Sequence, residues 1–171
     1  RTSRTFPNVN PESAQPPQPN TGAWVVGQML LLTALLIIPP WMRGQWPPLI
    51  AYGGGAAFIL YSAFTGLAGV FQLGRNLTPQ PKPRAGGELV TDGVYALLRH
   101  PLYASLMAFG CGWALLWSSV AGVLLAAVFI LYLHAKTRFE ETLLHAAYPG
   151  YADYAKRVPR YLPHSKALRK R

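Results

Sequence analysis

Three long stretches without a charged residue restrict what this chain can fold into. Residues 24–38 and 49–73 contain no Asp, Glu, Lys or Arg, and neither do residues 102–133, a run of 32 residues. About 20 apolar residues in a helix span the hydrocarbon core of a bilayer. The third run is long enough for two spans joined by a turn at Trp117–Gly122, WSSVAG. A soluble helical protein with buried helices is the alternative.

We therefore expect an all-α integral membrane protein with about four transmembrane helices. Their expected bounds are roughly 23–40, 49–71, 101–117 and 119–137.

The distribution of charge predicts how these helices are oriented. Sixteen Lys and Arg against six Asp and Glu give a net charge of +10, and nine of the basic residues follow residue 134. The loop 39–48 has only Arg43. In a four-span arrangement the N-terminal tail, the loop 72–101 and the C-terminal tail share one face, which the positive-inside bias makes cytoplasmic. Contact of basic residues with anionic lipid explains the charge; nucleic-acid binding is the alternative.

The two tails differ from the apolar middle of the chain. Residues 1–22 are rich in Pro, Asn and Gln and lack the apolar core of a signal peptide, which predicts a disordered cytoplasmic tail. Residues 164–171 form a basic tail. Residues 23–163 are expected to form a single membrane domain. Cys111 is the only cysteine, so no intrachain disulfide is possible.

Glycines in the second span have two interpretations. Residues 53–55 are GGG, and Gly66 and Gly69 follow. A phosphate-binding loop would require a Lys-Ser or Lys-Thr pair, which is missing here. Close helix packing through small residues is the favoured interpretation.

Two segments outside the expected spans have distinctive patterns. Residues 72–92 contain alternating prolines and then Gly86-Gly87, which predicts an extended loop with a bend. Beyond the fourth span, helical spacing continues to Pro149-Gly150. A short helix at about 150–157 would then place Tyr151 and Tyr154 on one face. We expect a cytoplasmic helical hairpin folding back against the bundle.

The stretch GVYALLRHPLYASL combines a cation, a histidine and a proline at the edge of an apolar run. Inside a helix, Pro101 would kink the chain and free the carbonyl of Leu97. The predicted outcome is a ligand cavity lined by Tyr95, His100 and Tyr103. The alternative is that Pro101 only starts the third helix, with Arg99 as an interfacial cation.

A second charged group, Lys136, Arg138, Glu140 and Glu141, lies at the expected cytoplasmic end of the fourth span. Glu140 shares a helix face with Lys136 and Glu141 shares one with Arg138, so the two glutamates face different directions. Solvated ion pairs are one interpretation. A carboxylate facing a polar cavity, suited to a cationic or hydroxyl-bearing ligand, is the other.

Several common kinds of site are excluded by pattern. The four histidines show no metal-ligand spacing with acids on one helix face, so no metal site is expected. No nucleophile elbow and no Gly-x-Gly-x-x-Gly after a strand is present.

The motifs ELVTDGVYALLRHPLY, RFEETLL and YPGYADYAKRVPRYLP together resemble the isoprenylcysteine carboxyl methyltransferase family, which is related to the membrane phospholipid methyltransferases. The resemblance covers about residues 70–163. It implies a membrane enzyme that uses S-adenosyl-L-methionine without a Rossmann domain, with the cofactor at the cytoplasmic face and a lipophilic acceptor entering from the bilayer. The cofactor-binding core would be residues 72–163.

Carried over motif by motif, the resemblance also implies a set of site residues. The cofactor contacts would be Gln80, Gly87, Glu88, Leu89, Val90, Tyr95, His100, Pro101, Leu102, Tyr103 and Glu140. The family places a basic residue four positions before that glutamate, near the acceptor, and here it is Lys136 rather than an arginine with a bidentate fork. Lys136 and Arg138 would orient an anionic acceptor or lipid headgroup and are the predicted catalytic residues.

The sequence therefore predicts a methyltransferase of a prokaryotic inner membrane with both termini cytoplasmic. Its acceptor would be an isoprenoid-thiol carboxylate, a small thiol or a lipid amine. The alternatives are an NADPH-dependent membrane reductase related to sterol reductases, and a non-catalytic membrane scaffold.

Overall fold

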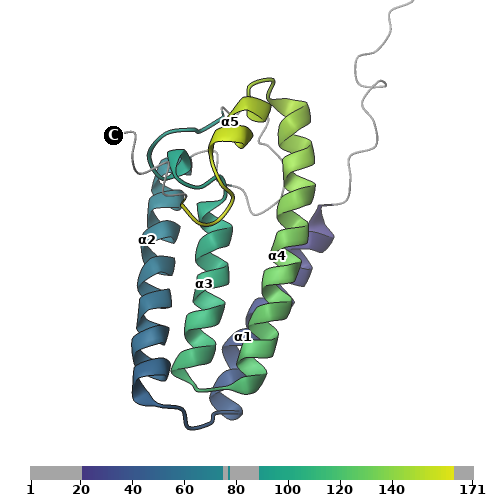
Figure 1. Ribbon diagram of the computed structural model, residues 1–171. Coiled ribbons are helices and arrows are strands. Elements are labelled where there is room, and N and C mark those ends of the chain that lie inside the picture. Colours follow the sequence, from purple (N-terminus) through teal and green to yellow (C-terminus); the bar gives the residue numbers. More distant parts are fainter. Residues whose placement is uncertain (1–20, 75–76, 78–88, 164–171) are drawn as a thin grey trace, which may run out of the picture.

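Four long helices of alternating direction make up most of the described part of the chain (Figure 1). The computed structural model describes residues 21–74, 77 and 89–163. The start of α1, the end of α2, the start of α3 and the end of α4 lie at one end of the bundle, together with the short helix α5 (Figure 1). The expected all-α class is confirmed, since the described part of the chain contains no strand. The helix bounds are α1 Gly22–Trp41, α2 Gly55–Leu73, α3 Pro101–Leu116, α4 Val120–Ala147 and α5 Tyr151–Arg157.

Three helical segments of the described chain are long and apolar enough to cross a membrane. They are α1 with 20 residues, the 25-residue segment Leu49–Leu73, and α4 with 28 residues. The second of these starts with a π-helical stretch, η2 (Leu49–Gly54), that continues into α2. The apolar helix α3 has 16 residues, about 24 Å, less than the roughly 30 Å hydrocarbon core. The expected spans are therefore present as helices, with α3 the short one.

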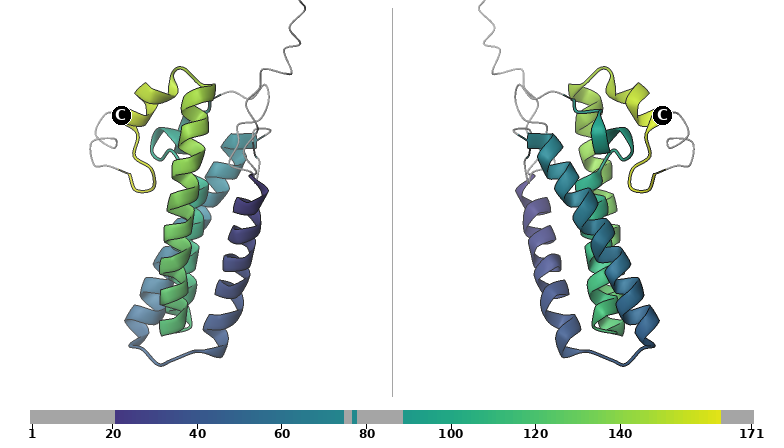
Figure 2. Two further views of the ribbon diagram at one scale, coloured as in Figure 1. Left: turned by 90° about the vertical axis from the view of Figure 1, so that its right-hand side faces the viewer. Right: turned by 90° about the vertical axis from the view of Figure 1, so that its left-hand side faces the viewer.

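The turn between α3 and α4 lies where the sequence predicted it. α3 ends at Leu116 and α4 begins at Val120. The side chain of Ser119 caps α4 by accepting a hydrogen bond from the backbone N–H of Gly122 at 3.1 Å. Both views in Figure 2 place this turn and the α1–α2 connection at the end of the bundle opposite α5. The long apolar run is thus two antiparallel helices, as expected.

Small residues bring α2 and α3 together. A Cβ added at Gly55 would lie 2.8 Å from the Leu116 side chain, and one at Gly112 would lie 2.9 Å from the Gly55 carbonyl. Ser105 of α3 donates a hydrogen bond to the Ser62 carbonyl at 2.8 Å. Inside a bilayer, such close packing and interhelical hydrogen bonds are what hold helices together. The packing interpretation of the α2 glycines is confirmed for Gly55.

The apolar core holds α4 in register with α1 and α3. It consists of Leu35 from α1, Met107 from α3, and Ala126, Phe129 and Leu133 from α4. Leu35, Phe129 and Leu133 have 0% of their surface exposed. Because these contacts fix the rotation of α4, they also fix which of its polar residues face inward near its C-terminal end.

Candidate active site

The site begins at the junction of His100 and Pro101. Pro101 is the first residue of α3, and His100 before it has the non-helical angles φ −129° and ψ 63°. The first helical hydrogen bond runs from the Ala104 N–H to the His100 carbonyl at 3.0 Å. A proline at this position costs no helical bond because the first N–H groups of a helix have no partner in it. The predicted kink at Pro101 is therefore wrong: Leu97 precedes the helix, and Pro101 starts it.

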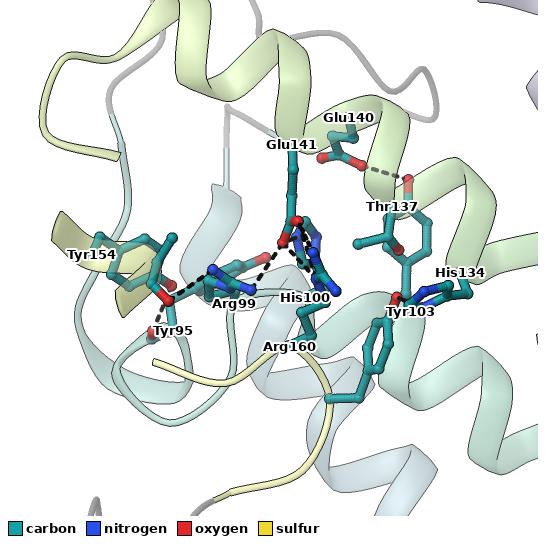
Figure 3. A network of polar contacts seen from close by, with 12 residues as sticks. Tyr95, Arg99, His100, Tyr103, His134, Thr137, Glu140, Glu141, Tyr154 and Arg160 are labelled. Carbon is teal, nitrogen blue, oxygen red and sulfur yellow. Dashed lines mark hydrogen bonds and ion pairs between the residues drawn. The ribbon is translucent and has the colours of Figure 1, made fainter. Parts of the chain in front are cut away.

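Glu141 of α4 lies at the centre of a buried charged cluster (Figure 3). Its carboxylate contacts Arg99 Nη2 at 3.1 Å and His100 Nε2 at 3.2 Å. Arg160 binds it with two nitrogens, at 2.6 Å from Nη2 and 3.0 Å from Nε to the same oxygen. Glu141 is only 7% exposed. Helix spacing alone suggested that Glu141 pairs with Arg138. Instead, Glu141 pairs with cations from outside its own helix.

The residues after α5 cross the start of α3. We call residues 158–163 the C-terminal strap. The backbone N–H of Arg99 donates to the Pro159 carbonyl at 2.8 Å, and that of His100 donates to the Arg160 carbonyl at 3.1 Å. The strap is therefore joined to the α3 start by backbone bonds and to α4 through the Arg160 side chain.

Tyr161 extends the strap to two further helices. Its carbonyl accepts a hydrogen bond from the Tyr61 hydroxyl of α2 at 2.7 Å. Its own hydroxyl lies 3.3 Å from Nδ1 of His134 in α4. A segment of the chain's C-terminal part thus bridges α2, α3 and α4 at this end of the bundle.

Glu140 faces a different group of residues. Its carboxylate accepts a hydrogen bond from the Tyr103 hydroxyl of α3 at 2.7 Å. Lys136, one turn earlier, lies 5.5 Å from the Tyr103 ring centre and donates to the Gln28 side chain of α1 at 2.6 Å. The His100 and Tyr103 rings stack with centres 5.7 Å apart and planes inclined by 26°. Residues from α1, α3 and α4 therefore meet around one carboxylate and one ammonium group.

The chain before α3 is held in place by buried hydrogen bonds. Tyr95 belongs to a short 3-10 helix, η4 (Gly93–Ala96), and its carbonyl accepts from the Tyr154 hydroxyl of α5 at 2.6 Å. The backbone N–H of Val94 donates to the Gln72 side chain at the end of α2, at 2.7 Å. These contacts fix the approach of the chain to His100.

Burial and ion pairing set the protonation of groups around the site. Burial raises the pKa of the Tyr95 and Tyr154 phenols above their ordinary value of 10.0. Hydrogen bonding to Glu141 raises the pKa of the Arg160 guanidinium. At neutral pH both phenols are therefore uncharged and Arg160 carries a full charge.

Some of the predicted site residues come together and others do not. His100, Tyr103, Lys136 and Glu140 form one group, whereas Arg138 is exposed on α4. Pro101 and Tyr95 are buried, and Leu89, Val90 and Leu102 are half-buried. The remaining predicted contacts, Gln80, Gly87 and Glu88, lie outside the described residues.

Several residues of the site were not identified from the sequence. Patterns did not place Arg99 or Glu141 in the site, beyond an interfacial cation and a possible partner of Arg138, and did not single out Arg160 or Gln28. One signal was available: the whole chain has six acids, so two adjacent acids near a His-Pro junction invite a search for separate partners. Nothing in the spacing pointed to Arg160, because it follows the end of α5 in an irregular segment.

The donor set around Glu140 determines which ligands fit. Within the described residues Glu140 receives one hydrogen bond, from Tyr103, and a carboxylate offers about four acceptor positions. Tyr103, which donates that hydrogen bond, stacks on the His100 ring. Among the described residues, no three His, Cys, Asp or Glu side chains form a group that could hold a metal ion. The free acceptor positions of Glu140 fit a ligand with hydroxyl or amine donors.

Comparison with known proteins finds two kinds of relative, one an enzyme and the other a metal-resistance protein. Protein-S-isoprenylcysteine O-methyltransferase of Mus musculus is 31% identical over 119 residues, which are 67% of this chain and 42% of the mouse protein. Cobalt-zinc-cadmium resistance protein CzcN of Cupriavidus metallidurans is 40% identical over 82 residues, 47% of this chain and 38% of that protein. The chain thus spans about two fifths of the length of these curated relatives.

The family comparison covers the structural core of the site. The profile of the phospholipid methyltransferase family matches residues 50–150, more than half of the chain. This stretch includes η4, the His100–Pro101 junction and the Glu140–Glu141 pair. The apolar helices and these relatives together make the chain an integral membrane protein. It belongs to the phospholipid methyltransferase family, and the resemblance to isoprenylcysteine carboxyl methyltransferases that the sequence motifs indicated is confirmed.

Proposed function

We propose that the chain is an S-adenosylmethionine-dependent membrane methyltransferase that methylates a carboxylate on a lipophilic, isoprenylcysteine-like acceptor. The observation that carries the proposal is the group formed by His100, Tyr103, Lys136 and Glu140. It combines a carboxylate, stacked rings and a buried ammonium at the end of a bundle of apolar helices. Family membership and the mouse relative support the type of reaction.

The cofactor would be held by the carboxylate and the rings. Glu140 would accept hydrogen bonds from the ribose hydroxyls or the amino group, while His100 and Tyr103 would contact the polar parts and the adenine. When bound, S-adenosylmethionine supplies an electrophilic methyl group on a sulfonium sulfur. Methyl transfer requires aligned reactants in a site with little water, and positioning alone contributes up to about 7–11 kcal/mol. Helix α3 and the strap, by fixing His100 and Tyr103, would provide that alignment.

Lys136 supports a carboxylate as the acceptor group. Lys136 is almost fully buried, at 1% exposure; its ammonium donates to the Gln28 side chain and lies over the Tyr103 ring, and the Glu140 carboxylate follows one turn later in α4. An anionic acceptor would replace the Gln28 oxygen as its hydrogen-bond partner, because a charged pair in a low-dielectric site is stronger than an ion–amide contact. Arg138, exposed on the same helix, would contact lipid headgroups instead.

The membrane orientation that we propose rests on the length of α4 and on the distribution of basic residues. At about 42 Å for 28 residues, α4 is longer than the roughly 30 Å hydrocarbon core, so one of its ends projects beyond it. Basic residues concentrate after residue 134, so we assign the end with α5 and the site to the cytoplasmic face of a prokaryotic inner membrane.

Binding and turnover assays on detergent-purified protein test the proposal. Calorimetric titration should show binding of S-adenosylhomocysteine and none of NADPH. The reverse would identify a reductase, and binding of neither would indicate a scaffold. Incubation with methyl-labelled S-adenosylmethionine and an N-acetylated S-prenylcysteine should give a product that releases labelled methanol in base, as a methyl ester does. Label that stays bound in base would indicate a thiol or amine acceptor.

A further inference from the structure

Glu141 has a role that the proposed cofactor contacts do not include. We propose that Glu141 is a positioning residue, which holds the His100 ring as the Nε2–H tautomer so that its Nδ1 is left as a hydrogen-bond acceptor for a bound ligand. The ligand's identity rests on the proposed function, but the tautomer is a property of the protein alone.

The chemistry of the two partners dictates the tautomer. An ionised carboxylate only accepts hydrogen bonds, so a ring nitrogen at hydrogen-bond distance from it must carry a proton. Here the distance from His100 Nε2 to Glu141 Oε1 is 3.2 Å. The partner of one ring nitrogen determines what the other nitrogen can do, as in carboxylate–histidine pairs around metals. With Nε2 donating to Glu141, a neutral ring has its lone pair on Nδ1.

The charges facing the cluster keep Glu141 ionised. Two guanidinium groups, from Arg99 and Arg160, lie within 3.1 Å of its oxygens. They come from different elements, the α3 approach and the strap, so the carboxylate joins three parts of the chain (Figure 3).

Neighbouring groups hold the His100 ring and backbone in place. The ring is stacked on Tyr103 and lies 6.5 Å from the Tyr161 ring centre. The backbone of His100 is bound on both sides, by the Arg160 carbonyl and by the Ala104 N–H. His100 itself is 6% exposed. A buried ring held in this way presents one nitrogen to Glu141 and the opposite side of the ring to its other neighbours.

The two glutamates thus have separate tasks. Glu141 is hydrogen-bonded to His100 and Arg160 and forms an ion pair with Arg99, whereas Glu140 receives one hydrogen bond within the described residues. Glu141 is engaged by protein groups and acts through His100, whereas Glu140 keeps acceptor capacity for a ligand.

Nitrogen NMR of ligand-free protein tests the tautomer directly. Protein labelled with ¹⁵N-histidine would be purified in detergent micelles and measured at pH 8.5, where histidine side chains are ordinarily neutral. The His100 signal is assigned as the one missing in His100→Asn. We expect a protonated Nε2 and an unprotonated Nδ1. A His100 signal from the Nδ1–H tautomer, or from a ring protonated on both nitrogens, would overturn the proposal.

Variants of Glu141 separate positioning from general structural support. Glu141→Gln keeps the shape but can both donate and accept, so His100 should become a mixture of tautomers, and the dissociation constant for S-adenosylhomocysteine should rise roughly tenfold. Glu141→Asp keeps the charge and should retain part of the preference for the Nε2–H tautomer and part of the affinity for S-adenosylhomocysteine. Asp153→Asn is the matched control, because Asp153 is an exposed acid on α5 paired with Lys156; it should change neither.

The outcomes distinguish this inference from the proposed function. An unchanged His100 tautomer in folded Glu141→Gln contradicts the inference whatever the ligand. If Glu141→Gln fails to fold, the wild-type spectrum still tests whether His100 is the Nε2–H tautomer. Wild-type protein with the Nε2–H tautomer but without affinity for S-adenosylhomocysteine would support the positioning by Glu141 and contradict the proposed cofactor.

Discussion

Glu140 and Glu141 are neighbours in α4, yet their carboxylates bind different parts of the protein. Glu140 accepts a hydrogen bond from Tyr103 in α3, at 2.7 Å. Glu141 binds Arg160 of the C-terminal strap, with a shortest distance of 2.6 Å. Adjacent helical residues point about 100° apart, so one turn of α4 contributes both to the ligand-facing group and to the cluster that holds the strap. Substitutions of the two glutamates should therefore have different consequences.

Glu140→Gln should weaken cofactor binding without unfolding the protein. The change removes a charged acceptor but keeps the size of the side chain. Loss of a hydrogen bond to a charged group costs about 1.5–3 kcal/mol, so the dissociation constant for S-adenosylhomocysteine should rise about 10- to 100-fold. Calorimetry measures it, and Asp153→Asn provides the control for loss of a surface carboxylate. Wild-type affinity in Glu140→Gln would show that Glu140 does not contact the cofactor.

Lys136→Met should affect the acceptor more than the cofactor. Methionine keeps most of the length and fills the buried position but removes the ammonium that donates to Gln28 and lies over the Tyr103 ring. We expect KM for an anionic acceptor to rise about 10-fold or more, with affinity for S-adenosylhomocysteine changed less. Lys136→Arg keeps the charge and should retain part of the activity. An unchanged KM in Lys136→Met would remove Lys136 from the acceptor site.

Gly112→Ala should destabilise the bundle because the added methyl group has no space. Its Cβ would lie 2.9 Å from the backbone carbonyl of Gly55, and a backbone atom cannot move aside as a flexible side chain can. Overpacking of this kind costs about 1–3 kcal/mol. Gly150→Ala is the matched control, because nothing lies within 4 Å of its added Cβ. Thermal unfolding in detergent should show a lower midpoint for Gly112→Ala alone; equal midpoints would mean that α2 and α3 are less closely packed.

The spans could be predicted from the sequence because they depend on local composition. Runs without charge fix where helices cross the membrane, and the predicted spans 23–40 and 49–71 correspond to Gly22–Trp41 and Leu49–Leu73. Tyr151 and Tyr154 were also expected on one face of a short helix, and both are buried.

The charged cluster could not be predicted because its partners are chosen by tertiary structure. Helix spacing suggested Arg138 as the ion-pair partner of Glu141. The rotation of α4 instead exposes Arg138 and turns Glu141 toward Arg99 and Arg160. The role of Pro101 could not be predicted for a different reason. A proline kinks a helix when it lies inside it, but starts one when it lies at the first position. Only the position of the helix start, after His100, decides between the two.

Alkaline pH should destabilise the folded protein through its buried phenols. Burial raises the pKa of Tyr154 above 10.0 in the folded state. Above pH 10 the unfolded phenol loses its proton while the folded one keeps it, so the free energy of unfolding falls as pH rises, by up to about 1.4 kcal/mol per pH unit for one group. Tyr95 acts in the same direction.

Tyr154→Phe separates this effect from the hydrogen bond that the phenol makes. The variant leaves the buried Tyr95 carbonyl without the donor that lies 2.6 Å away, which should cost about 1–3 kcal/mol at pH 8. Its unfolding free energy should then fall less steeply above pH 10 than that of the wild type. Parallel curves for the two proteins between pH 8 and 11 would contradict the assignment of the alkaline loss to Tyr154.

The two ends of the bundle should be accessible from opposite sides of the membrane. In a Cys111→Ala background, Asp153→Cys places an exposed thiol on α5, and Arg43→Cys places one on the loop at the other end. Because basic residues are retained in the cytoplasm, an impermeant maleimide added to intact cells should label Arg43→Cys and not Asp153→Cys. Permeabilised cells should show labelling of both, which controls for reactivity. Labelling of Asp153→Cys alone in intact cells would place the candidate site on the outer face, where a cytoplasmic methyl donor could not reach it.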